Sequence, residues 1–185
     1  MYWYQDHAAA LSLKAIRRCL EGKCPVDSIT HLITVSCTGM AAPGLDLELV
    51  EALGLPPNVF RTSVNFMGCY AAVHALKLAH ALAAAPQTKV LIVCTELCTL
   101  HFQQAPTLEN LLSSLLFADG SAAALIVSDD VDPDTAGAGL RIKGFYSEII
   151  PEGKKEMTWG LSSTGFQMTL TGYVTDLIRD RKSVV

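Results

Sequence analysis

One cysteine lies where a strand-like segment passes directly into a helical one. The segment NFMGCY (65–70) joins a β-branched run, residues 59–67, to an Ala- and Leu-rich run, residues 69–85. A cysteine in the first turn of a helix lies in the positive field of the helix dipole, which favours the nucleophilic thiolate. Gly68 permits a sharp turn, and the Cys69 amide is one of the unpaired donors of a helix start, able to face an oxyanion. Most cysteines at such junctions only pack, so the pattern alone leaves both roles open.

The elements around this junction alternate between apolar strands and helices. We expect strands at residues 31–37, 59–67, 89–95, 121–128 and 140–150. We expect helices after a cap at Asp6 and at residues 46–53, 69–85, 108–117 and 170–180. Near-continuous apolar strands that alternate with helices predict an α/β fold with a sheet covered on both faces.

Composition and charge exclude several function classes. The 185 residues are 50% hydrophobic and 17% charged, with a formal net charge of −4 and no cluster of Lys and Arg interleaved with aromatic residues, which argues against nucleic-acid binding. The apolar stretches are too often interrupted to span a membrane, and the N-terminal residues lack the pattern of a signal peptide. None of the six cysteines forms a CxxC pair, which argues against zinc and suits a reducing, cytoplasmic compartment.

Several sequence blocks occur together and in one order. They are ITHLITVSCTGMAAPGLD (29–46), NFMGCYAAVHALKLAHAL (65–82), VLIVCTEL (90–97), LLFADGSAAALIVSDD (115–130) and MTWGLSSTGFQMTLTGYVTDLI (157–178). Together they resemble the type III polyketide synthases, the chalcone/stilbene synthase-like branch of the thiolase superfamily. The resemblance is closer to the bacterial members of this family than to plant chalcone synthase. The last block discriminates best, because the strand–Gly-Cys–helix junction is shared across that superfamily.

This resemblance implies a thiolase-like fold with a mixed sheet covered by helices. Residues 1–150 would form the N-terminal half, without its first strand–helix layer, and residues 151–185 the start of the C-terminal half. The family's catalytic histidine and asparagine lie downstream of the last helix seen here, and no such motif occurs in these residues. We therefore expect a truncated polyketide synthase that is inactive alone, because the pair stabilises the thioester oxyanion and the malonyl enolate.

The resemblance also implies a chemistry for Cys69. Its thiolate would attack an acyl-CoA thioester and hold the starter unit as a new thioester. Malonyl-CoA would then be decarboxylated, and the resulting enolate would attack the starter. Phe117 aligns with the family's gatekeeping phenylalanine, which assists decarboxylation; without the family it would read as a core aromatic. No cofactor or metal is implied beyond the CoA thioesters that serve as substrates.

Four further residues fall where the family contacts its substrate. Cys37, Cys98 and His101 fall in the lining of the starter pocket, where plant chalcone synthases carry threonines at these places. Ala42 lies in the loop at residues 40–44, which in the family reaches across a two-fold interface to close the partner's cavity. The resemblance therefore implies a homodimer.

Two other functions remain open from the sequence. The first is a condensing enzyme like β-ketoacyl-ACP synthase III, which would need a basic patch for an acyl carrier protein. The cluster Lys14, Arg17, Arg18 and Lys23 is the candidate, although it equally fits a solvated helix end. The second is a non-catalytic fragment, whose uncovered apolar surface would favour aggregation or association.

Overall fold

The structure is a computed structural model that describes residues 2–131, 139–163 and 165–181. The chain divides into two compact units. Unit 1 comprises Met1–Leu97 and Asp119–Phe145, and unit 2 comprises Cys98–Ala118 and Tyr146–Val185. The sequence-based division after residue 150 stays a prediction. Within the described residues, no helix is both long and apolar enough to cross a membrane.

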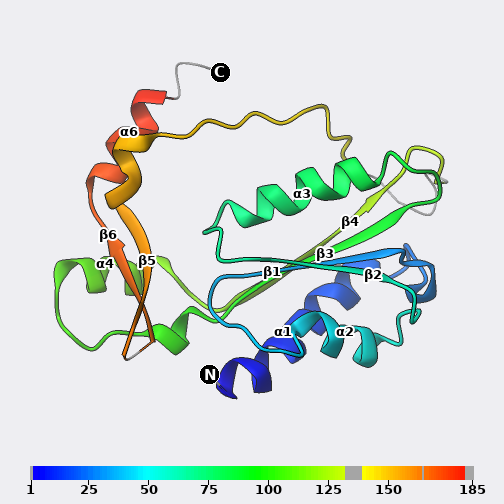
Figure 1. Cartoon of the computed structure of the whole chain (residues 1–185), viewed down its shortest axis with the longest axis horizontal. Helices are drawn as coiled ribbons and strands as arrows, with labels where there is room; N and C mark the ends of the chain where they lie inside the picture. The colour runs from blue at the N-terminus through cyan, green and yellow to red at the C-terminus, as the bar shows by residue number, and fades with distance from the viewer. Residues whose placement is uncertain (1, 132–138, 164, 182–185) are drawn as a thin grey trace. The chain divides into compact units, whose positions relative to one another are not determined.

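Unit 1 is built on a four-stranded mixed sheet with the order β2-β1-β3-β4. The strands are β1 (His31–Ser36), β2 (Phe60–Asn65), β3 (Lys89–Glu96) and β4 (Gly120–Val127). The first three are parallel, and β4 runs antiparallel to β3. The helices α1 (Tyr2–Leu20) and α2 (Leu45–Leu53) cover one face and α3 (Ala71–Leu82) covers the other (Figure 1). The short 3-10 helix η1 (Val26–Ser28) precedes β1. The predicted α/β fold with a mixed, helix-covered sheet is thereby confirmed.

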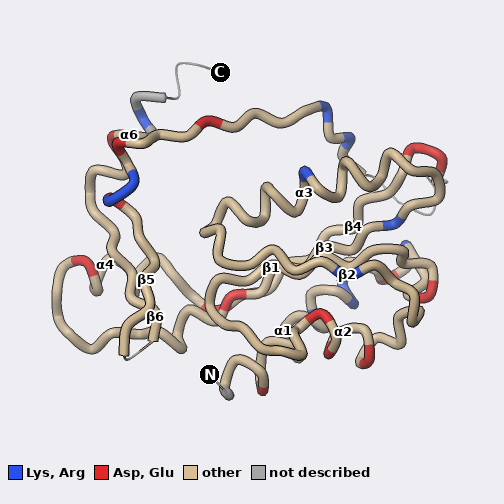
Figure 2. Tube along the Cα trace, viewed as in Figure 1, with Lys and Arg blue, Asp and Glu red and all other residues tan. Residues whose placement is uncertain are grey.

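The central strands are apolar on both sides because each face packs against helices. Leu32 and Leu91 are fully buried in a cluster with side chains of α1 and α2. Their sequence neighbours Ile33 and Ile92 point to the other face and pack with α3. The contacting face of α3 consists of alanines, Ala71, Ala75 and Ala79, which let the helix approach the sheet closely. Charged residues lie on helices, loops and strand ends and not in the middle of β1 or β3 (Figure 2).

Several expected helix and strand boundaries differ from those of the structure. Helix α1 begins at Tyr2, so Asp6 is an internal residue and not its cap. The helix extends this far because Tyr4 and Ala8 continue a stripe of buried side chains at every fourth position. Strand β2 ends at Asn65, because the positive φ angles of Phe66 (56°) and Gly68 (68°) turn the chain. Helix α3 begins at Ala71, two residues later than Cys69.

Unit 2 contains a hairpin and short helices. The strands β5 (Met157–Ser162) and β6 (Gly165–Leu170) pair antiparallel. The helical elements are η2 (Cys98–His101), α4 (Leu108–Leu116), η3 (Pro151–Lys155) and α6 (Tyr173–Arg181). Helix α4 and η2 both contact β6.

The strand expected at residues 140–150 is wrong. The chain there has no regular secondary structure, and Leu140 and Ile149 are exposed. An apolar run forms a strand only where a neighbouring strand accepts and donates the ladder hydrogen bonds. Within the described residues no strand pairs with this segment. Its apolar sequence pattern therefore predicted a strand that does not form.

Candidate active site

Three parallel strands bring the candidate residues of unit 1 to one edge of the sheet. Strands β1, β2 and β3 all end at this edge. Cys37 follows β1, Cys69 follows β2 by four residues, and Glu96 is the last residue of β3. The carboxyl end of parallel strands is where ligand sites form in open α/β sheets, because the loops that leave the strands converge there.

Cys69 lies in the turn that joins β2 to α3. The carbonyl oxygen of Gly68 accepts a hydrogen bond of 3.0 Å from the Ala71 amide, which closes the turn around the cysteine. Gly68 has a φ of 68°, and a Cβ there would meet nothing within 4 Å, so glycine is required by backbone conformation and not by space. Cys69 is solvent-exposed. Its thiol is thus accessible and lies just before the positive end of α3.

The thiol of Cys37 contacts this turn as well. The Sγ of Cys37 donates a hydrogen bond of 3.7 Å to the carbonyl oxygen of Gly68. Cys37 is buried, and both its burial and the nearby Glu96 carboxylate raise the pKa of its thiol. A protonated thiol is a donor and not a nucleophile. Cys37 therefore acts on Cys69 through the backbone of the turn.

Glu96 holds the segment that contains Cys37. Both carboxylate oxygens accept the Cys37 amide, at 2.9 and 3.0 Å. The hydroxyl of Thr38 donates to the same carboxylate at 2.7 Å, and the Ser36 hydroxyl donates at 3.4 Å. Thr38 Oγ1 in turn accepts the Leu97 amide at 2.8 Å. This network ties the ends of β1 and β3 together and engages the Glu96 oxygens with protein donors.

The other shifted thiols of unit 1 are less suited to nucleophilic attack. Burial raises the pKa of Cys19, and it raises the pKa of Cys94 to about 11. Both side chains are partly buried, whereas Cys69 is exposed. Accessibility and turn geometry therefore single out Cys69 among these thiols.

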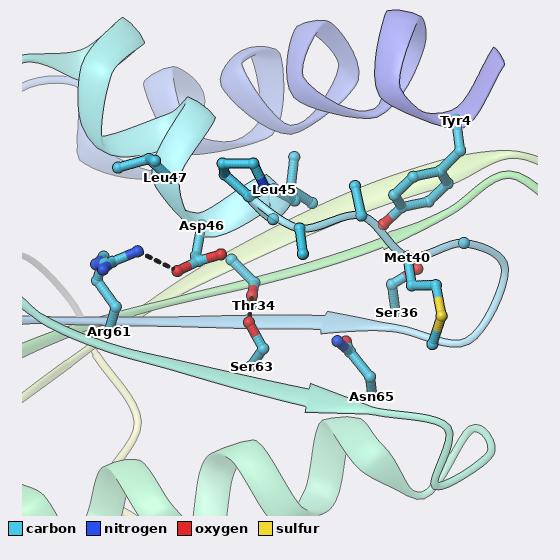
Figure 3. A pocket seen from close by; sticks show the side chains of 15 residues that line it. Tyr4, Thr34, Ser36, Met40, Leu45, Asp46, Leu47, Arg61, Ser63 and Asn65 are labelled. Atoms are coloured by element: carbon cyan, nitrogen blue, oxygen red, sulfur yellow. Dashed lines mark hydrogen bonds and ion pairs between the residues drawn. The ribbon is translucent and has the colours of Figure 1, made fainter. Parts of the chain in front are cut away.

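Ala42 lies in a different part of unit 1. It is exposed and lines a cavity of about 390 Å³ between the loop at residues 39–47 and the strands β1 and β2 (Figure 3). The lining mixes polar and apolar residues, and an ion pair of 2.6 Å between Arg61 and Asp46 crosses one side. Cys69 does not line this cavity. The structure thus separates Ala42 from the nucleophile turn within unit 1.

His101 belongs to unit 2 and is held by the hairpin. Its Nδ1 accepts the backbone amide of Phe166 at 3.2 Å. The ring packs edge-on against Trp159 and Phe166, with centroids 5.4 and 5.0 Å apart, and these two rings stack on each other. Because Nδ1 accepts a hydrogen bond, the proton of the neutral imidazole ring lies on Nε2. These contacts orient His101, and its role toward a substrate stays a prediction.

Cys98 and Phe117 also belong to unit 2. Cys98 begins the 3-10 helix η2 that carries His101, and its thiol is partly buried. Phe117 follows the last residue of α4 and leaves the helix with an extended backbone, while its amide donates to the Ser113 carbonyl at 2.9 Å. Its side chain is half-buried. The roles predicted for both residues remain predictions.

In the structure, Cys37 contacts the turn that carries Cys69 through a backbone carbonyl that the sequence did not indicate. The Gly68 carbonyl and the hydroxyl of Thr38 were not singled out. A signal existed for Thr38, because small polar residues follow the apolar run of β1 and a carboxylate ends the apolar run of β3. Parallel strands that end at one edge would have placed Thr38 near Glu96.

Comparisons with known proteins agree on one family. The family described as chalcone and stilbene synthases, N-terminal domain, matches residues 5–130. "Probable polyketide synthase 1" of Dictyostelium discoideum is 34% identical over 151 residues, which cover 81% of this chain and 5% of that protein. "Alpha-pyrone synthesis polyketide synthase-like Pks18" of Mycobacterium tuberculosis is 31% identical over 180 residues, covering 94% of this chain and 46% of that protein.

A solved structure is similar as well. The C-terminal type III polyketide synthase domain of Steely1, a type I/III hybrid from Dictyostelium, superposes with a TM-score of 0.85 at 30% sequence identity. The match covers 99% of this chain and 50% of that structure. The chain thus spans about half the length of Pks18 and of the Steely1 domain.

Proposed function

This chain belongs to the chalcone and stilbene synthase family, and from that premise we propose that it carries the acyl-accepting cysteine of a type III polyketide synthase. The observation that supports this most directly is the exposed Cys69 in the Gly68 turn, at the carboxyl edge of three parallel strands. The family model matches residues 5–130, which include this turn, and a relative named a polyketide synthase is similar along nearly the whole chain.

The proposed loading step is a thioester exchange. The Cys69 thiolate attacks the carbonyl carbon of an acyl-CoA, the C–S bond to CoA breaks, and the CoA thiolate leaves. The result is an acyl group on Cys69 and free CoA. Backbone amides at the start of a helix are suited to stabilise the oxyanion of the tetrahedral intermediate. No cofactor enters this step.

The proposed extension step uses malonyl-CoA. Loss of CO₂ from its malonyl group leaves an enolate, which attacks the Cys69 thioester and releases the cysteine. We assign Phe117 to the entrance of the reaction cavity in this step, with Cys37, Cys98 and His101 near the starter unit and Ala42 at the subunit boundary. These assignments follow from the family resemblance of the surrounding motifs.

We further propose that the protein acts as a homodimer in the cytoplasm. The exposed edge of β2, at the end of the four-stranded sheet, supports the association of two copies. The cysteines support a reducing compartment, because all six are free thiols.

Mass spectrometry after incubation with acyl-CoA tests the loading step. A series of acyl-CoAs from acetyl to palmitoyl should slowly add one acyl mass to the tryptic peptide 62–77, in which Cys69 is the single thiol. The variant Cys69→Ala should lose this adduct, whereas the matched change Cys24→Ala should keep it. Acylation that persists at another cysteine in Cys69→Ala would contradict the assignment.

The same samples test the extension step. With malonyl-CoA added, the 185-residue chain alone should release no polyketide, because no histidine follows His101 to help stabilise the enolate. Release of a triketide or tetraketide pyrone by the purified chain would show that groups within these residues suffice.

A further inference from the structure

The peptide bond between Gly68 and Cys69 is held in one orientation by two donors. The Ala71 amide donates to the Gly68 carbonyl at 3.0 Å, and the thiol of Cys37 donates to the same oxygen at 3.7 Å. The C=O and N–H groups of a trans peptide lie in one plane and point in opposite directions. A Gly68 carbonyl that faces these two donors therefore directs the Cys69 amide away from them.

The Cys69 amide is available to a substrate. Among the residues that the structure describes, no carbonyl or side chain accepts a hydrogen bond from it. It belongs to the same residue as the exposed thiol, and the amide of the nucleophile itself is a recurring member of oxyanion holes. The direction of this N–H group therefore bears on the oxyanion that forms when the Cys69 thiolate attacks a thioester.

Cys37 is a fixed donor beneath this peptide. Both carboxylate oxygens of Glu96 accept its amide, at 2.9 and 3.0 Å, which holds its backbone in place. Burial and then the Glu96 carboxylate raise the pKa of its thiol, whereas hydrogen bonding to the backbone of residues 66–68 lowers this pKa by less. The thiol therefore keeps its proton at neutral pH, and the backbone around its sulfur is the turn itself.

We propose that Cys37 is a positioning residue for acyl loading, whose thiol holds the Gly68 carbonyl and thereby keeps the Cys69 amide directed at the oxyanion. This role rests on the proposed loading of Cys69. It differs from the lining of a starter pocket, in which Cys37 would act by contact with the acyl chain and not through the turn.

Two reactions of Cys69 separate the direction of its amide from the reactivity of its thiolate. Attack on an acyl-CoA forms a tetrahedral oxyanion that needs a donor, whereas iodoacetamide loses iodide from a saturated carbon and forms no oxyanion. A change in the pKa or the exposure of Cys69 alters both rates, but a misdirected amide alters acylation alone. Mass spectrometry of the tryptic peptide 62–77 reads both products.

The variants Cys37→Val and Cys37→Thr form a matched pair. Their side chains have similar shapes, and only threonine carries a donor. Losing an oxyanion-hole donor outright slows a reaction about 100- to 1000-fold; because the Ala71 amide still holds the Gly68 carbonyl, we expect Cys37→Val to slow acylation about tenfold. Alkylation of Cys37→Val should stay within about twofold, and Cys37→Thr should stay within about threefold in both reactions.

Two controls test the alternatives. Cys94→Val makes the same change at a partly buried thiol of β3 and should alter neither rate. The loss of acylation in Cys37→Val should be equal for acetyl-CoA and decanoyl-CoA, because both form the same oxyanion. A loss seen with decanoyl-CoA alone would make Cys37 a pocket residue and overturn the positioning role.

The remaining outcomes distinguish failure of this role from failure of the proposed function. Equal acylation of Cys37→Val and Cys37→Thr, or a fall in alkylation that matches the fall in acylation, would overturn the positioning role and leave the loading step intact. If the unmodified chain gains no acyl group at Cys69 while iodoacetamide still labels that residue, the loading step is wrong and the role of Cys37 is wrong with it.

Discussion

The thiol of Cys37 and the carbonyl oxygen of Gly68 are joined by a hydrogen bond of 3.7 Å. This contact links the end of β1 to the turn that carries Cys69, and the bonds from Glu96 to the Cys37 amide extend the link to β3. The position of the exposed cysteine therefore depends on three strands and not on its own loop alone.

Cys69 should be the fastest-reacting thiol of the folded chain. It is exposed, whereas Cys37 is buried and Cys94 has a pKa raised to about 11. Brief treatment with iodoacetamide at pH 6–7, followed by peptide mass spectrometry, should label Cys69 before the other five. Faster labelling of Cys19 or Cys24 would argue against a nucleophilic role for Cys69.

Replacing Glu96 by glutamine should destabilise unit 1. One carboxylate oxygen would become an NH₂ donor facing the Cys37 amide and the Thr38 hydroxyl, which both donate. The loss of satisfied hydrogen bonds should lower the free energy of unfolding by about 1–3 kcal/mol. Denaturant unfolding measures this change. Glu51→Gln on α2, an exposed site, should stay within about 0.5 kcal/mol, and an equal effect there would refute the network's importance.

Gly165→Ala should destabilise the hairpin of unit 2. Gly165 has a φ of 120°, and a Cβ there would lie 3.0 Å from His101 Nδ1. We expect a loss of about 1–3 kcal/mol, because a side chain at this φ is strained. Thermal unfolding followed by Trp159 fluorescence reports it. Gly160→Ala on β5, where a Cβ meets nothing within 4 Å, is the matched control and should have a much smaller effect.

Asp130 should make part of the stability dependent on acid pH. The Ser128 hydroxyl and then the Gln87 amides donate to its carboxylate and lower the pKa of Asp130. Its contribution is therefore fully present above the ordinary carboxyl pKa of about 4 and is lost as the pH falls through the lowered value. Asp130→Asn should reduce the free energy of unfolding at pH 7.

The sign of that effect can be checked by titration. Denaturant unfolding between pH 7 and 3 should show the difference between Asp130→Asn and the unmodified chain shrinking at the acid end. Asp129→Asn, which removes only an exposed ion pair with Arg141, is the control and should change the free energy of unfolding at pH 7 by at most about 1 kcal/mol. A difference that grows with acidity would mean that the carboxylate is not stabilised as described.

The sequence predicted what depends on local pattern. The alternation of apolar strands and helices, and the Gly68-Cys69 junction itself, follow from residue types within short windows. The hydrogen bond from the Cys37 amide to the Glu96 carboxylate could not be predicted in the same way. It joins residues 59 positions apart and forms only because β1 and β3 are neighbours. The start of α3 was placed two residues early, because composition does not report the positive φ angles that delay the helix.

The contacts of His101 show the same limit. The family resemblance implied that His101 lines a starter pocket, but sequence did not show that its ring packs against Trp159 and Phe166, more than fifty residues later in the chain. The hairpin of β5 and β6 carries both rings and lies in the sequence block 157–178. The residues of that block pointed to a family, but they did not show that the hairpin packs against His101. Sequence therefore located the residue and not its partners.

The place of β1 between β2 and β3 has a consequence for biosynthesis. His31 pairs with Phe60 on one side and Val90 on the other, so the central strand leaves the ribosome long before its second neighbour exists. At 5–20 residues per second, about 1.5–6 s pass between the synthesis of Phe60 and that of Val90, and during this time β1 has only one of its two neighbours. We therefore expect soluble yield to rise with chaperone capacity and to fall with faster translation.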